Sequence, residues 1–158
     1  MKEIHVATFG TPGAGKLQSP LPPVALTALQ AIQSTKVYPK GSEFFLEGQS
    51  PTGIYILYSG RAEMSVTDNE GRKMMLGMAL PGDVLGLSAV VSGKHHAKTA
   101  VAAMPSQAGF IKSKDFLHFL EHHSEAAFWV VQLLSDRVIT TLEQISCIKH
   151  TPSRDIRE

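Results

Sequence analysis

Between residues 36 and 112 the chain consists of short segments of alternating apolar and polar residues, separated by turns that contain glycine. Ala62, Met64 and Val66, for example, alternate with polar residues, which is typical of a strand with one buried face. Strands are expected at 61–67, 73–78, 98–103 and 107–111, with a turn at Asn69, Glu70 and Gly71. Short strands with glycine turns and no long helix among them predict a mainly β fold, a double-stranded β-helix (jelly roll) or barrel.

The N-terminal part is predicted to be a flexible tail, residues 1–22, followed by a short helix that starts at Pro23. The helix is indicated by the helical spacing of Ala25, Leu29 and Ile32. Within the tail, residues 10–16 (GTPGAGK) have the glycine and lysine spacing of a phosphate-binding P-loop. That loop also needs a hydroxyl residue after the lysine and a helix behind it, whereas Leu17 and a proline cluster follow here, so we interpret the segment as tail.

Two helices are predicted after residue 112. Ser113 is expected to cap a short helix, and Ser124 a long one whose first turn holds Glu125, a favourable charge at the positive end of the helix dipole. The expected organisation is a tail at 1–22, a β-roll with flanking short helices at 23–123, a long helix at 124–150 and a hinge or tail at 151–158.

The long helix carries an apolar stripe with alternating spacings of three and four residues, which is the spacing of a coiled-coil seam. The stripe consists of Val131, Leu134, Val138, Thr141, Ile145 and Ile148. Such a stripe can pack on its own domain or on a second chain. Because about 25 helical residues extend roughly 37 Å, which exceeds the size of the roll, we expect a homodimer formed through this helix.

Composition limits the class of protein. The chain has 158 residues, is 43% hydrophobic and carries a formal net charge of +1, so it can bury a core and has no bulk charge that attracts nucleic acid or membrane. No apolar run reaches the ~20 residues of a membrane span, and the N-terminus does not resemble a signal peptide, so a cytoplasmic location is expected. The single cysteine, Cys147, excludes an intramolecular disulfide and a cysteine-ligated iron–sulfur cluster.

Four glycine-marked segments, in this order, resemble the cyclic-nucleotide-binding sensor domain of the Crp/Fnr family of transcriptional regulators. They are 38–41 (YPKG), 44–48 (FFLEG), 53–61 (GIYILYSGR) and 80–99 (LPGDVLGLSAVVSGKHHAKT). The resemblance covers the chain from about Pro22 onward and implies a non-enzymatic regulatory domain. It also implies that the long helix pairs with its symmetry mate, and that the loop before the last strands binds the phosphate of a nucleotide effector.

The resemblance places the ligand site at residues 86–98. The predicted ligand-binding residues are Gly86, Leu87, Ser88, Ala89, His95, His96, Ala97, Lys98 and, from the long helix, Thr141. Leu87 replaces the glutamate that holds the ribose hydroxyl in the cyclic-AMP-binding version, and His96 replaces the arginine that holds the phosphate. Each lost bond to a charged group costs on the order of 1.5 to 3 kcal/mol, so cyclic AMP should bind at least about a hundredfold more weakly.

Another small anion remains an option, because donors and positive charge come together at the loop. They are supplied by Ser88, the amides after Gly86, Lys94, His95, His96 and Lys98. In that case affinity should fall as the pH rises above the pKa of His96. The other interpretation, a solvated turn with incidental basic residues, stays open, as does a dimerisation module that has lost ligand binding. No helix-turn-helix follows within the 158 residues, so DNA binding is expected only if such a domain lies beyond this chain.

A cupin-like metal-binding barrel enzyme is the alternative from another class. Neighbouring residues on a strand face opposite sides, so His95 and His96 do not form a joint metal site there. His118 and His122 form an i, i+4 pair in the predicted short helix, where we expect them to be solvated. We therefore predict no metal, no catalytic residues and no enzyme activity.

Overall fold

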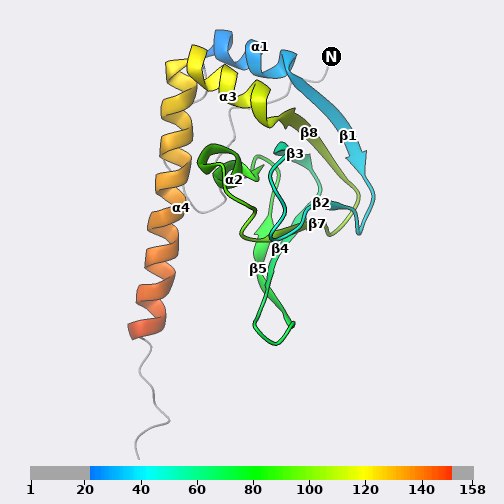
Figure 1. Cartoon of the computed structure of the whole chain (residues 1–158), viewed down its shortest axis with the longest axis vertical. Helices are drawn as coiled ribbons and strands as arrows, with labels where there is room; N and C mark the ends of the chain where they lie inside the picture. The colour runs from blue at the N-terminus through cyan, green and yellow to red at the C-terminus, as the bar shows by residue number, and fades with distance from the viewer. Residues whose placement is uncertain (1–21, 151–158) are drawn as a thin grey trace, which may run out of the picture.

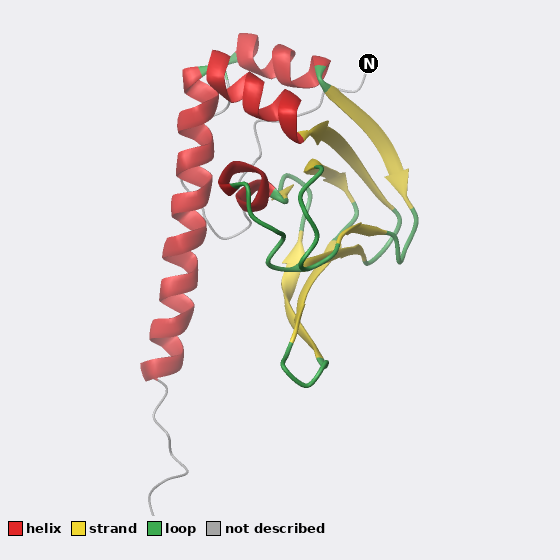
Figure 2. Cartoon of the chain, viewed as in Figure 1, coloured by secondary structure: helices red, strands yellow, loops and turns green. Residues whose placement is uncertain are grey.

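The computed structural model describes residues 22–150, without the side chains of residues 23, 144 and 147–150. It contains eight strands and four helices in this part of the chain (Figures 1 and 2). The strands are β1 (Gln33–Tyr38), β2 (Glu43–Phe45), β3 (Gly53–Ser59), β4 (Ala62–Thr67), β5 (Lys73–Ala79), β6 (Val84–Leu85), β7 (Thr99–Ala102) and β8 (Ser106–Lys112). The helices are α1 (Pro23–Ala31), α2 (Leu87–Ser92), α3 (Ser113–His122) and α4 (Ser124–His150).

The strands form two four-stranded antiparallel sheets, ordered β1-β8-β3-β6 and β2-β7-β4-β5. This arrangement confirms the predicted mainly β, jelly-roll class. The hairpin between β4 and β5 projects away from the rest of the roll (Figure 1). Its turn is fixed by Asp68, whose carboxylate accepts hydrogen bonds from the amides of Glu70 and Arg72, and by Gly71 with φ of 81°.

Two apolar cores lie on opposite faces of the sheet that contains β3. Ile54 and Ile56 of β3 face the helices, whereas Leu57 faces the second sheet, as the two-residue period of a strand requires. The core under the helices includes Leu29 of α1 and Phe116 of α3, both almost fully buried. The helices are therefore part of the domain and hold α4 in place through this core.

The helix α4 leaves the α1 and α3 end of the molecule and runs along one side of the roll (Figure 2). It spans residues 124–150, as the sequence predicts. Its first turns are anchored, because Ala126, Trp129 and Val130 are buried in the core with α3. No helix within residues 22–150 is long and apolar enough to cross a membrane. Of the predicted tails at 1–22 and 151–158, residues 1–21 and 151–158 lie outside the described residues, and so does the P-loop-like string at 10–16.

Several local predictions need correction. The segment expected to be a loop contains the short helix α2, flanked by Gly86 and Gly93, both with left-handed φ. Ser113 does not cap α3: Lys112 is the N-cap residue, and the buried Ser113 Oγ has no hydrogen-bond partner. Nor does Ser124 precede α4, since it is already its first residue and the amide of Ala127 donates to the carbonyl of His123.

The strand β4 also deviates from simple alternation. Its register with β5 shifts between Met64 and Ser65, so that both residues are buried, although the sequence pattern placed Ser65 on the exposed face. A bulge of this kind changes the face on which the following side chains lie. Since Met64 contacts the site described next, the irregularity lies close to the functional region.

Candidate functional site

A pocket of about 290 Å³ lies between the β-roll and α4. The roll contributes residues of β4, β5, β6 and the adjoining loops, and α4 contributes one face of its middle turns. The lining residues are Met64, Leu76, Gly77, Met78, Ala79, Asp83, Val84, Leu85, Gly86, Lys98, Asp136, Arg137, Thr140 and Thr141. The volume is at the small end of the range for ligand sites, which suits a ligand of metabolite size.

Arg137 joins the two walls of this pocket. Its Nη2 donates a hydrogen bond of 2.6 Å to the carbonyl of Val84, which belongs to β6 of the roll. Next to Val84, Asp83 is held in place because its Oδ2 accepts a 2.8 Å hydrogen bond from the amide of Leu80. A guanidinium on α4 is thus bonded directly to the roll, and both bonded residues line the pocket.

Two cations, Lys98 and Arg137, and two carboxylates, Asp83 and Asp136, line this region. Burial raises the pKa of Asp83, against the effects of the Leu80 amide and the Arg137 charge. Burial also lowers the pKa of Lys98, and the nearby charge of Arg137 lowers it further. For Arg137 burial lowers the pKa, while Asp83 and Asp136 raise it. Lys98 therefore has a neighbouring positive charge, and no acidic group among the described residues counteracts the lowering of its pKa, so an anion bound beside it would be stabilised.

The predicted ligand-binding residues do not all lie at this pocket. Gly86, Lys98 and Thr141 line it. Leu87 and Ala89 are instead buried, and Leu87 belongs to the core beneath the helices. The remaining loop residues that are exposed are Ser88, His95 and Ala97. The Nδ1 atom of His95 lies 3.3 Å from the hydroxyl oxygen of Ser50.

His96 is buried next to the pocket and not on its surface. Its ring stacks on Phe45, with centroids 3.9 Å apart and an interplanar angle of 9°. Burial lowers the pKa of this imidazole, so it is uncharged near pH 7. The left-handed φ of 81° favours glycine at position 86, and a Cβ there would also lie 3.2 Å from the His96 ring.

Sequence reasoning did not identify Asp83, Arg137, Met64 or Thr140 as site residues. Asp83 was included only as part of the segment 80–99, and Arg137 lies 53 positions away from its partner Val84. A signal was available for Arg137, because it falls on the same face of α4 as the buried Ala126 and Val130 and the partly buried Leu133. An arginine on a core-facing stripe requires a polar partner, and that partner is part of the site.

The predicted dimer stripe lies partly on the free face of α4. Val131, Val138 and Ile145 are 57%, 58% and 44% exposed, whereas Leu134 packs against the core and Thr141 lines the pocket. The side chain of Ile148 is outside the described residues. Two further large apolar side chains extend the exposed stripe at the same three-and-four spacing, Phe128 and Leu142.

Comparison with known proteins identifies the family. The sequence model of the cyclic nucleotide-binding domain matches residues 35–123, which is more than half of the chain. This chain belongs to that family. Among curated proteins none matches the chain significantly.

Several solved structures have the same fold. The catabolite activator protein of Thermus thermophilus has 20% identity and a TM-score of 0.75, over 84% of this chain and 62% of that one. The sensor domain of the regulator DNR of Pseudomonas aeruginosa has 25% identity and a TM-score of 0.66, over 80% and 85%. The c-di-GMP-responsive global regulator CLP of Xanthomonas campestris has 14% identity and a TM-score of 0.69, over 81% and 65%. This chain thus spans less than two thirds of the Thermus and Xanthomonas proteins.

These matches confirm the Crp/Fnr-type resemblance and the expectation of a domain that is not an enzyme. The cupin-like alternative has no counterpart among them. His95 and His96 lie in the loop before β7 and not on a strand of the roll. Among the described residues, the group of histidine and acidic side chains with metal-binding spacing lies on the outside of α3.

Proposed function

We propose that the chain is a ligand-sensing regulatory domain of Crp/Fnr type, in which a small anionic effector binds between the roll and α4. The observation that carries this proposal is that one pocket is lined by both parts, with Arg137 of α4 bonded to Val84 of the roll. A ligand in such a position contacts two elements at once, so its binding free energy depends on how α4 packs on the roll.

The charge of the effector is inferred from Lys98 and Arg137. The pKa of Lys98 is lowered by burial and by Arg137, so a negative group between the two cations would relieve the unfavourable contact. We assign charge recognition to these residues and not to His96, which is buried and uncharged near pH 7. Gly86, Thr140 and Thr141 complete the polar wall of the pocket. A cyclic nucleotide or another small phosphate or carboxylate compound is the expected class.

Signalling is proposed to pass through a homodimer formed by α4. The exposed stripe Phe128, Val131, Val138, Leu142 and Ile145 lies on the face of α4 opposite its buried residues. Exposed apolar stripes of this spacing are stabilised by a second helix. Thr141 lines the pocket, and the next residue in the sequence, Leu142, belongs to the stripe. A ligand that changes the packing of Thr141 would therefore act directly beside the dimer contact.

The regulatory output of the domain is proposed to be a change in DNA binding. The matched proteins are transcriptional regulators, and we propose that DNA is recognised by a helix-turn-helix domain attached to a domain such as this one. A cytoplasmic location and the division into domains remain predictions from the sequence.

A thermal-shift screen tests the proposal. The panel consists of cyclic and linear nucleotides, phosphorylated metabolites and organic acids, at pH 6 and pH 8. At least one compound should raise the melting temperature of the wild type, and Lys98→Gln should abolish that shift. The control Lys94→Gln changes an exposed lysine of the neighbouring loop and should keep it. A panel without any stabilising compound, or a stabilisation that Lys98→Gln leaves intact, would refute the assigned pocket.

A further inference from the structure

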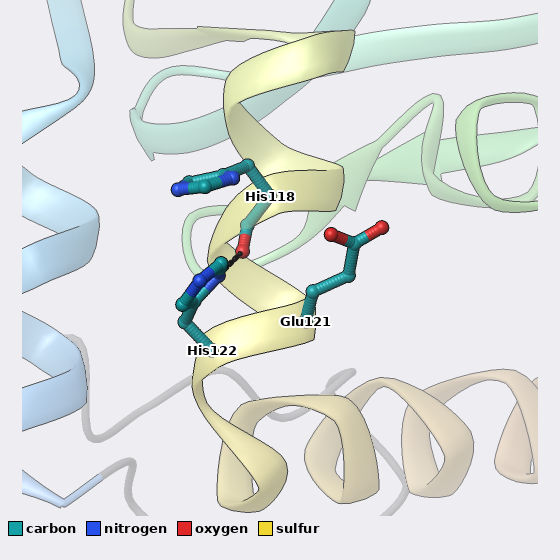
Figure 3. Close-up of side chains that lie close together, drawn as sticks. All are labelled: His118, Glu121 and His122. Atoms are coloured by element: carbon teal, nitrogen blue, oxygen red, sulfur yellow. Dashed lines mark hydrogen bonds between the residues drawn. The ribbon is translucent and has the colours of Figure 1, made fainter.

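The exposed face of α3 carries a cluster of metal-ligating side chains that is independent of the effector pocket. His118 and His122 are separated by one helical turn, and Glu121 lies between them in sequence (Figure 3). One ligand atom from each of the three residues lies within 4.8 Å of the others, and all three side chains are exposed. The two imidazole rings lie side by side, with centroids 4.1 Å apart.

The hydrogen bonding of His122 leaves the correct nitrogen available. Its Nδ1 is 2.9 Å from the backbone carbonyl of His118, shown as the dashed line in Figure 3. A carbonyl only accepts, so Nδ1 must carry the proton, and the lone pair of the neutral ring is then on Nε2. Ligating histidines commonly donate their other N–H to a backbone carbonyl in this way, which fixes both the tautomer and the ring orientation.

We propose that His118, Glu121 and His122 form a surface site for a divalent transition metal, with Zn²⁺ as the preferred occupant. Two imidazoles and one carboxylate are a zinc-type ligand set that leaves a coordination position for water, whereas Mg²⁺ and Ca²⁺ prefer all-oxygen sites. Zinc bonds of about 2.0–2.2 Å hold two ligand atoms no more than about 4 Å apart. The side chains must therefore close slightly around the ion, which their exposure on one helix allows.

The site would stabilise the end of α3. The metal would connect residues one turn apart in the last turns of this helix, and only His123 separates α3 from α4. His123 itself is not a ligand in this proposal, because its Nδ1 bonds to the carbonyl of Phe119 and its ring stacks on the Phe119 side chain. Zinc binding should thus stiffen the corner from which α4 departs.

Zinc titration of the chelator-treated full chain, by calorimetry and by competition with a fluorescent chelator, tests the site. We expect one Zn²⁺ per chain and an increase in melting temperature with added zinc. Because loss of an outer-shell partner already costs 10–100-fold in affinity, His118→Gln and His122→Gln should each weaken zinc binding at least about tenfold. Glu121→Gln should weaken it less, since both imidazoles remain.

The matched controls are His95→Gln and Glu125→Gln, which change an exposed histidine and an exposed carboxylate on other elements. Both should bind zinc as the wild type does. Imidazole nitrogen NMR provides a second readout: zinc should shift the Nε2 resonance of His122 while Nδ1 keeps its proton. The site is refuted if tens of micromolar zinc leave the wild type metal-free, or if affinity survives His122→Gln.

Discussion

His96 illustrates how one side chain can be close to a binding site without taking part in its charge. It replaces the cation that the family pattern suggests, and the fold has buried it against Phe45, where a protonated ring is disfavoured. The positive charge at the pocket comes instead from Lys98 and Arg137. Position 96 thus contributes packing, and the glycine at 86 is required in part by the ring that stands there.

The lowered pKa of His96 predicts a pH dependence of stability. In the unfolded chain this group titrates near its ordinary pKa of about 6.5, whereas in the folded protein it does so at lower pH. Between these two values the unfolded state binds more protons, so the free energy of unfolding should fall as the pH decreases below about 6.5. The variant His96→Phe, which retains an aromatic ring against Phe45, should lose less stability over the same range. Urea unfolding at several pH values measures both proteins, and parallel profiles would contradict the argument.

A second prediction at this scale concerns cyclic AMP. Leu87 is fully buried in the core, so it offers the ribose nothing, and His96 offers the phosphate no charge. Cyclic AMP and cyclic GMP should therefore bind more weakly than micromolar, and calorimetry measures this directly. Micromolar or tighter affinity for either nucleotide would show that Lys98 and Arg137 fully replace the missing groups.

At the scale of elements, regular periodicity in the sequence predicted individual helices and strands, but it did not predict the contacts between distant elements. The sequence period predicted α4 and its bounds, and glycine turns with two-residue alternation predicted the hairpin of β4 and β5. The short helix α2 was not predicted, because it has only six residues, LSAVVS, and its leucine and two valines could equally belong to a short buried strand. Nor could the contact between Arg137 and Val84 be predicted, since sequence periodicity carries no information on which distant carbonyl an arginine meets.

Removing the Arg137 side chain should loosen α4 from the roll. Arg137→Met keeps most of the aliphatic volume but leaves the Val84 carbonyl without this donor, and a hydrogen bond to a charged group contributes about 1.5 to 3 kcal/mol. We expect the free energy of unfolding to decrease by about that amount in chemical denaturation. Arg61→Met, the same change at an exposed arginine, should have little effect. Equal stability of the two variants would mean that the bond to Val84 does not hold the helix.

The free face of α4 gives a prediction for assembly. Val138 is 58% exposed and lies in the middle of the apolar stripe, so a carboxylate there would be buried between two paired helices. Val138→Glu should therefore give monomers in sedimentation experiments at tens of micromolar, where we expect the wild type to be a dimer. Glu143→Lys changes a charge beside the stripe and should leave the dimer intact. A wild type that is already monomeric would show that the stripe does not pair.

At the scale of the whole molecule, the three parts of the account meet at α4. Its first turns are fixed in the core with α3, its middle turns line the proposed effector pocket, and the opposite face of the same turns is the proposed dimer contact. A ligand that changes how the middle turns of α4 pack on the roll would also change the position of the proposed dimer face on the same turns. Binding of effector and pairing of chains should then be thermodynamically coupled, each altering the affinity of the other.

Sedimentation equilibrium with and without the compound that most stabilises the wild type in the thermal-shift panel measures this coupling. Coupling free energies between linked sites typically correspond to changes of about 5- to 150-fold, so the dissociation constant of the dimer should change at least about fivefold. In Lys98→Gln, which cannot hold the anion, the constant should be the same with and without the compound. A wild-type dimer whose dissociation constant is unaffected by the bound compound would contradict the claim that this domain senses a ligand through α4.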